Sequence, residues 1–172
     1  MRQRKLVLSL TLLVVAATAF TLSQAIAGSA ADASKRDVLI NATRTSAASG
    51  EVVTLTGSGV FSLKEPTALF VRGYFLHKRA DGSVVAEGYW KATKLESFKS
   101  FGGVPGTPLE GGRAVFDVTF FPRGGAPSVT FHNLTVTCVV GNPPKGAEEG
   151  VTVGPFTKTI EHPHRFTLFL TV

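Results

Sequence analysis

Apolar and polar residues alternate with a period of two along most of the chain, which is the pattern of half-buried strands. The alternation over residues 51–56 predicts one strand, and a weaker run over residues 37–43 predicts another before it. Gly57-Ser58-Gly59 is expected to break or bulge the strand at residues 51–56 before Val60 and Phe61.

Two long apolar runs, residues 67–78 and 83–93, are separated by Arg79-Ala80-Asp81-Gly82. An Asp-Gly pair supplies the positive-φ positions of a tight turn, so the two runs are predicted to form a hairpin. Both faces of the first arm carry aromatic residues. We therefore expect this hairpin to lie centrally in a sheet or to be covered on both sides.

The next segment interrupts the alternation, because Leu95, Phe98 and Phe101 repeat at a spacing of three. This spacing predicts one or two helical turns. Residues 102–112 hold five glycines and two prolines, and they are expected to form the longest loop.

Strand patterns return in the second half of the chain. Residues 114–120 predict a strand that stops at Pro122, because proline cannot donate to a sheet ladder. The apolar phase slips within residues 128–140, which predicts a bulge near His132-Asn133. A turn at residues 141–146 and strands at residues 151–159 and 165–172 complete the expected order of elements.

About eight to ten short strands without helical crossovers are typical of a single antiparallel β-sandwich. A closed β-barrel is the alternative, because both architectures bury alternate side chains. The predicted organisation is a flexible segment at residues 28–36 followed by one all-β domain at residues 37–172.

The N-terminus has the three parts of a cleavable secretory signal peptide. Basic residues precede an apolar run over residues 6–22, and Ala25-Ile26-Ala27 follows as a small-residue cleavage site. Cleavage after residue 27 predicts a secreted or periplasmic protein of 145 residues. An uncleaved membrane anchor is the alternative, since the run is near the lower length limit of a spanning helix.

Charge and cysteine content narrow the class of protein. Removing Arg2, Arg4 and Lys5 with the signal segment lowers the formal net charge from +6 to +3, which is a weak argument for a nucleic-acid partner. No membrane association is expected after cleavage. The single cysteine, Cys138, alternates with Leu134 and Val136 and is predicted to be a buried small hydrophobe. A reactive thiol or an intermolecular disulfide is the alternative.

Candidate catalytic and metal-binding residues are few. His162 and His164 lie two apart and could begin a metal site with His77 and His132, but two ligands do not make a site. We expect loop histidines and no bound metal or cofactor.

The carboxylates Glu87 and Asp117 could form a general acid and base pair. Their positions fit a solvated sheet face better, because the opposite parity of each strand is apolar. A Gly-x-Ser-x-Gly nucleophile motif is absent from the sequence, and Gly57-Ser58-Gly59 does not open a helix as a phosphate loop would. No catalytic residue is therefore assigned.

Asn41-Ala42-Thr43 and Asn133-Leu134-Thr135 match the N-glycosylation acceptor pattern, whose use depends on the host. A glycan at Asn133 would mean that the predicted bulge is exposed.

The 13 phenylalanines against two tyrosines and one tryptophan favour core filling over recognition, and Tyr89-Trp90 is the one pair that suits a sugar-binding face. We therefore expect an exported, non-catalytic β domain with a binding or structural role, whose partner could be a protein, a glycan or a small apolar ligand. A barrel that carries a small hydrophobic molecule is one alternative. An enzyme whose site forms only in three dimensions is another.

Overall fold

The computed structural model describes residues 32–160 and 164–172, and these residues form an all-β fold with nine antiparallel strands. The all-β antiparallel class and the strand number are as predicted. The predicted signal segment and His162 lie outside the described residues. The strands are β1 (Lys35–Ser46), β2 (Val52–Ser62), β3 (Leu69–Lys78), β4 (Val84–Gly103), β5 (Leu109–Pro122), β6 (Val129–Cys138), β7 (Gly150–Thr152), β8 (Lys158–Ile160) and β9 (Phe166–Thr171).

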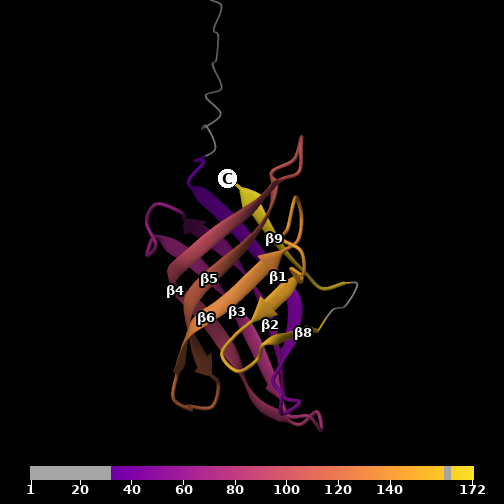
Figure 1. Ribbon diagram of the computed structural model, residues 1–172. Helices are drawn as coiled ribbons and strands as arrows, with labels where there is room; N and C mark the ends of the chain where they lie inside the picture. Colours follow the sequence, from indigo (N-terminus) through magenta and orange to yellow (C-terminus); the bar gives the residue numbers. More distant parts are fainter. Residues whose placement is uncertain (1–31, 161–163) are drawn as a thin grey trace, which may run out of the picture.

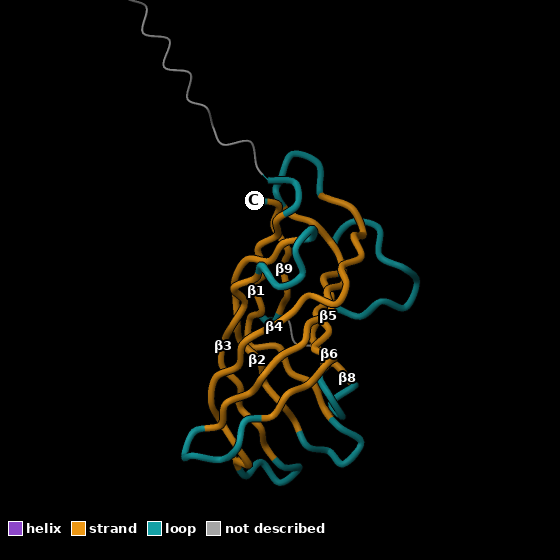
Figure 2. Tube along the Cα trace, turned by 90° about the vertical axis from the view of Figure 1, so that its left-hand side faces the viewer, coloured by secondary structure: helices purple, strands orange, loops and turns teal. Residues whose placement is uncertain are grey.

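All nine strands belong to one sheet with the order β4-β3-β2-β1-β9-β5-β6-β7, and β8 pairs with β1. Because β4 also pairs with β5, the hydrogen-bonded path closes on itself. Its two halves form layers that cross over a shared interior, with β5 and β6 in front of β1, β2 and β3 in Figure 1. The view turned by 90° separates the same two layers (Figure 2).

The predicted hairpin is confirmed. β3 and β4 pair with Tyr74 opposite Tyr89, and the turn between them is closed by hydrogen bonds from the amide of Arg79 to the carbonyl of Ser83 and from the amide of Gly82 to the carbonyl of Arg79. Gly82 has a φ of 85°, the left-handed conformation that the Asp-Gly pair predicted.

The predicted helical turns at Leu95, Phe98 and Phe101 are wrong, because β4 continues as a strand to Gly103. Its register with β5 shifts repeatedly: Leu95 pairs with Phe116 and Phe98 with Ala114, so three residues of β4 advance against two of β5. Each bulge returns an apolar side chain to the interior. A spacing of three in this sequence therefore reflects a bulged strand.

Two further predictions, both about glycine-rich segments, are wrong. The long loop expected at residues 102–112 is only residues 104–108, because β5 already begins at Leu109. β2 runs without a break through Gly57-Ser58-Gly59. Gly57 lies opposite Gly73, and a Cβ on Gly73 would stand 1.8 Å from the carbonyl oxygen of Thr56. These glycines permit close packing of backbones within the sheet.

The bulge predicted near His132-Asn133 is confirmed, since both residues lie opposite Asp117 between the pairs Phe116–Leu134 and Val118–Phe131. The strand predicted at residues 151–159 is instead two short strands, β7 and β8, joined by a turn at Gly154. The last strand is confirmed as β9.

Aromatic rings fill the interior. Phe61 lies 5.3 Å from Phe116 and 5.7 Å from Phe98, measured between ring centroids, and Phe98 lies 5.3 Å from Phe169. These tilted and edge-to-face contacts join strands from both layers into one core. The phenylalanines thus act mainly as core residues, as the sequence predicted.

Two carboxylates, Glu110, which is buried, and Glu149, which is half-buried, connect strands that are distant in sequence. Glu110 on β5 forms an ion pair with Arg36 on β1, and the two side chains are only 8% and 11% exposed. Glu149 accepts hydrogen bonds from the amides of Val139 and Thr167, both at 2.7 Å, and from the hydroxyl of Thr167 at 2.6 Å. Glu149 therefore connects β9 to the end of β6.

Within the described part of the chain, no helix is long and apolar enough to cross a membrane.

Candidate binding site

The β3–β4 hairpin lies centrally in the sheet, which is one of the two expected arrangements, because β3 also pairs with β2 and β4 with β5. Its outer face is uncovered. Phe70, Tyr74 and Tyr89 are 62%, 63% and 52% exposed. Most soluble domains bury such large rings or use them in recognition. The sheet therefore presents an aromatic surface to solvent.

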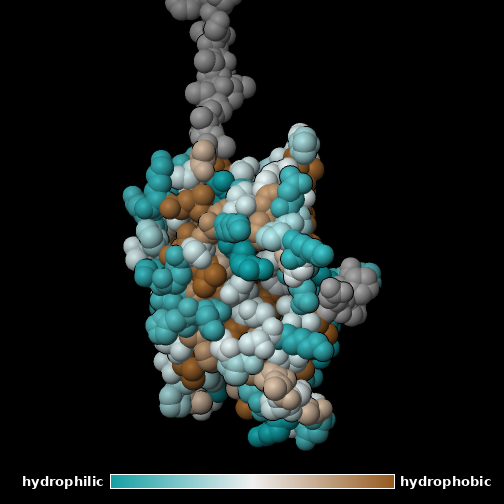
Figure 3. All heavy atoms as spheres, in the orientation of Figure 1, coloured by the Kyte–Doolittle hydropathy of each residue, from teal (hydrophilic) through white to brown (hydrophobic). Residues whose placement is uncertain are grey.

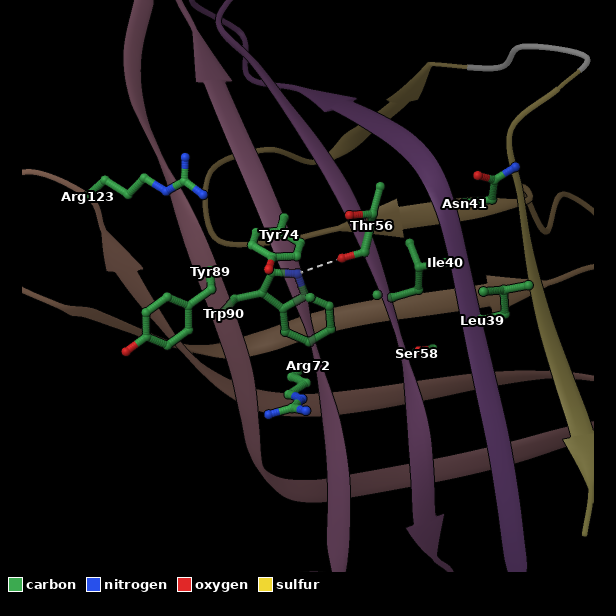
Figure 4. A pocket seen from close by; sticks show the side chains of 12 residues that line it. Leu39, Ile40, Asn41, Thr56, Ser58, Arg72, Tyr74, Tyr89, Trp90 and Arg123 are labelled. Carbon is green, nitrogen blue, oxygen red and sulfur yellow. Dashed lines mark hydrogen bonds between the residues drawn. The ribbon is translucent and has the colours of Figure 1, made fainter.

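This surface contains an open groove of about 790 Å³. One wall is formed by Leu39, Ser58 and Arg72, which follow one another across β1, β2 and β3. Polar and aromatic side chains form the other wall, and Arg123 lies at one end (Figure 4). That second wall consists of Asn41, Thr56, Tyr74 and Tyr89.

The floor of the groove exists because two glycines face a tryptophan. Gly57, Gly73 and Trp90 are cross-strand neighbours on β2, β3 and β4. The indole of Trp90 is fully buried, and its Nε1 donates a hydrogen bond to the carbonyl of Thr56 at 3.0 Å. A Cβ on Gly57 would lie 2.5 Å from the indole, so a side chain there would displace it. The predicted Tyr89-Trp90 pair is thereby divided, with Tyr89 outside and Trp90 inside.

Basic side chains lie over the exposed rings. The guanidinium carbon of Arg72 is 4.4 Å from the ring centroid of Phe70, and Nζ of Lys91 is 5.4 Å from that of Phe121. Tyr89 stacks on Phe121 at 4.7 Å with an interplanar angle of 11°. Cation–π contacts of this kind hold charged groups in place at the surface.

We call the outward-facing set of rings, bases and groove walls the groove face. Two carboxylates lie at its margin, Asp37 and Glu87. Oε1 of Glu87 lies 3.4 Å from Nη1 of Arg123. Both side chains are more than half exposed, so this ion pair is weak. The members of the groove face are Leu39, Asn41, Thr56, Ser58, Phe70, Arg72, Tyr74, Glu87, Tyr89, Lys91, Phe121 and Arg123.

The two carboxylates considered from the sequence do not meet. Glu87 is exposed as expected, whereas the side chain of Asp117 is only 16% exposed. Asp117 Oδ1 lies 3.1 Å from Nδ1 of His132, because the bulge in β6 places the histidine beside it. The His132 side chain is 78% exposed, so this pair lies at the molecular surface.

The other two histidines in the described residues, His77 and His164, lie on different parts of the fold. His77 faces inward, 5.1 Å from Phe156 between ring centroids, and His164 follows the undescribed residues. The described residues contain no group of three or more His, Cys, Asp or Glu placed to hold a metal ion.

Cys138 is buried, as predicted, with 1% exposure. Burial raises the pKa of its thiol, which keeps the group neutral and unreactive.

The two asparagines of the N-glycosylation pattern each form a hydrogen bond. The amide nitrogen of Asn41 donates to the carbonyl of His164 at 3.1 Å, and the side-chain oxygen of Asn133 accepts from the amide of Gly154 at 2.9 Å. Asn133 is exposed at the bulge, so its position is compatible with the acceptor pattern in the sequence.

The opposite outer face, formed by β5 and β6, has a different character. Hydrophilic and hydrophobic residues alternate across it (Figure 3). A smaller hollow of about 460 Å³ there is lined by five threonines together with Arg113, Glu148 and small or aliphatic residues, and by no aromatic ring. The exposed aromatic rings thus distinguish the groove face.

Sequence reasoning missed Arg72, Tyr74 and Arg123 as site residues. A signal was present for the first two, because the second parity of β3 alternates Phe70, Arg72 and Tyr74. Arg123 enters through the pairing of β4 with β5, which the sequence does not encode locally.

Comparisons of the chain with protein-family models, with curated proteins and with solved structures found no match.

Proposed function

We propose that this protein is an exported, non-catalytic binding domain and that its ligand occupies the groove face. The observation that carries the proposal is the exposure of Phe70, Tyr74 and Tyr89 beside ordered basic side chains. Aromatic residues and arginine are the types enriched where proteins bind their partners. A purely structural role would give no reason to leave these rings uncovered.

The composition of the groove supports binding without catalysis. Its twelve lining residues include no carboxylate, histidine or thiol. General acid and base catalysis depends mainly on those groups. The contact between Asp117 and His132 does not alter this inference, because neither residue lines the groove.

Export is supported by the N-terminal pattern of basic residues, an apolar run and Ala25-Ile26-Ala27. We expect the protein recovered from the medium or the periplasm to begin at Gly28, as measured by N-terminal sequencing and intact mass. Recovery only from the membrane fraction, with the first 27 residues retained, would contradict export by cleavage.

The carrier alternative receives no support from the interior. Phe61, Phe98, Phe116 and Phe169 occupy the space between the layers and contact one another. A carrier of a small hydrophobic molecule needs an enclosed apolar space in that region.

The proposal is tested with the triple variant Arg72→Ser, Tyr74→Ser, Tyr89→Ser, compared with the parent protein by calorimetric titration. Four soluble probes cover different chemistries: an acidic polysaccharide, a neutral polysaccharide, single-stranded DNA and a random peptide mixture. At least one probe is expected to bind the parent and to lose affinity for the variant. If each probe has the same affinity for the parent and for the variant, the groove face is not the binding surface.

A further inference from the structure

The ligand of the groove face can be assigned a chemical class, an inference that rests on the proposed function. Charge is the first criterion. Arg72, Lys91 and Arg123 all belong to this face, against two carboxylates at its margin: Glu87, which contacts Arg123, and Asp37, which lies two residues before Leu39 on β1. The excess of positive charge favours an anionic ligand.

The same charges disfavour a second copy of the chain as the occupant. In a two-fold dimer each groove face would meet its own copy. The arginines and the lysine of one copy would then face those of the other, and like charges brought together cost free energy.

The arrangement of the rings favours a sugar over a single-stranded nucleic acid as the ligand. Binding of single-stranded nucleic acid uses aromatic rings whose faces are open for stacked bases. Here the guanidinium of Arg72 covers the ring of Phe70, and Phe121 and Tyr89 cover one another. Only part of the aromatic surface is thus left for stacking.

The walls of the groove suit a ligand rich in hydroxyl groups. Asn41, Thr56, Ser58, Tyr74 and Tyr89 supply amide and hydroxyl groups that can both donate and accept hydrogen bonds. Tyrosine adds an apolar ring to its polar hydroxyl, which matches a sugar ring with apolar C–H groups and polar edges.

The shape of the groove suits an extended chain. It crosses four neighbouring strands, β1 to β4, and is open to solvent along its length. At about 4.8 Å between strands, it spans roughly 14 Å from β1 to β4. Arg72 lies along one wall and Arg123 at one end, so charged groups on successive units of a polymer could meet both (Figure 4).

We infer that the groove face binds an acidic polysaccharide, one whose sugar rings carry carboxylate or sulfate groups. Arg72 and Arg123 would contact the acidic groups, the exposed ring of Tyr74 would pack on a sugar ring, and the hydroxyl of Tyr89 would form a hydrogen bond with the sugar. The cation–π contact with Phe70 orders Arg72 in the absence of ligand, which reduces the entropy lost on binding.

The experiment is calorimetric titration of the protein with four probes: polygalacturonate, dextran sulfate, neutral dextran and an oligothymidylate. Dextran and dextran sulfate share a backbone, so they isolate the contribution of charge. We expect both acidic polysaccharides to bind, dextran to bind at least roughly tenfold more weakly, and affinity to fall as salt rises.

Two variants locate the site. Arg72→Gln and Tyr74→Ala are each expected to weaken binding of polygalacturonate by roughly tenfold, the size of a lost charge-assisted hydrogen bond or aromatic contact. Lys99→Gln is the matched control for charge, because Lys99 is exposed on β4 but does not line the groove. Thermal melting confirms that each variant folds.

Each other outcome overturns the inference. Equal loss with Lys99→Gln would mean that binding reflects net charge alone, and an oligothymidylate that binds as tightly as polygalacturonate would assign the face to nucleic acid. If the acidic polysaccharides fail but dextran or a peptide binds and depends on Tyr74, this inference is wrong while the proposed function stands. If nothing binds through the groove face, both are wrong.

Discussion

The two faces of the β3–β4 hairpin are built from similar residues but meet opposite environments. Inside, Phe75 and Trp90 are 7% and 0% exposed, and Phe75 packs 4.9 Å from Phe120 of β5. Outside, Phe70 and Tyr74 are more than 60% exposed. The aromatic content of a strand therefore does not determine its burial. The inner rings pack against rings of other strands, and the outer rings stay exposed to solvent.

Removing the largest inner side chain should give the largest effect on stability. Trp90→Ala is expected to lower the free energy of unfolding by about 3–5 kcal/mol, because a buried indole and its hydrogen bond are both lost. Denaturant titration measures the change. Trp90→Phe, which keeps most of the apolar volume, should cost clearly less, and a cost below about 1 kcal/mol for Trp90→Ala would show that the indole is not a core residue.

Two ion pairs, one nearly buried and one exposed, extend the comparison of inner and outer faces to charged residues. Glu110→Ala leaves Arg36 buried without its partner, so a loss of about 3 kcal/mol or more is expected. Glu87→Ala breaks the exposed pair with Arg123 and should cost no more than about 1 kcal/mol. Denaturation of both variants in parallel checks the contrast, and equal costs would contradict the difference in burial.

Substituting a glycine under the groove should lower the free energy of unfolding by less than Trp90→Ala or Glu110→Ala does. Gly73→Ala places a Cβ 1.8 Å from the carbonyl oxygen of Thr56, so the strands must separate locally and about 1–3 kcal/mol is expected to be lost. Gly103→Ala is the matched control, because its Cβ would make an ordinary 3.4 Å contact with the carbonyl oxygen of Leu109. Similar melting temperatures for the two variants would mean that close packing at Gly73 is not required.

An outer aromatic should have the smallest effect on stability. Tyr74→Ala is expected to change the free energy of unfolding by no more than about 0.5 kcal/mol, because the ring is mostly exposed. The same variant loses ligand affinity in the account given above. A large loss of stability would instead assign Tyr74 a structural role.

How far the sequence predicts this fold depends on the range of the interactions involved. The β3–β4 turn follows from Asp81-Gly82 alone, and the bulge in β6 follows from a slip in apolar phase near His132. Both features are local. The sequence therefore contains all the information needed to predict them.

The bulges of β4 were not predictable in the same way, because they depend on the register with β5. Leu95, Phe98 and Phe101 have a helical spacing, and only the partner strand turns that spacing into a bulged strand. The groove has the same character. Ser58 lies on β2, Arg72 on β3 and Arg123 in the turn after β5, and sheet pairing brings them together, so no local motif predicts the groove.

Binding of an acidic polysaccharide at the groove face is tested most directly by an NMR titration of the isotopically labelled protein with a short oligogalacturonate. We expect the largest shift changes at Arg72, Tyr74, Tyr89 and Arg123, while the amides of Phe75 and Trp90 exchange slowly throughout. Shift changes confined to the outer face of β5 and β6, or none at saturating ligand, would contradict it.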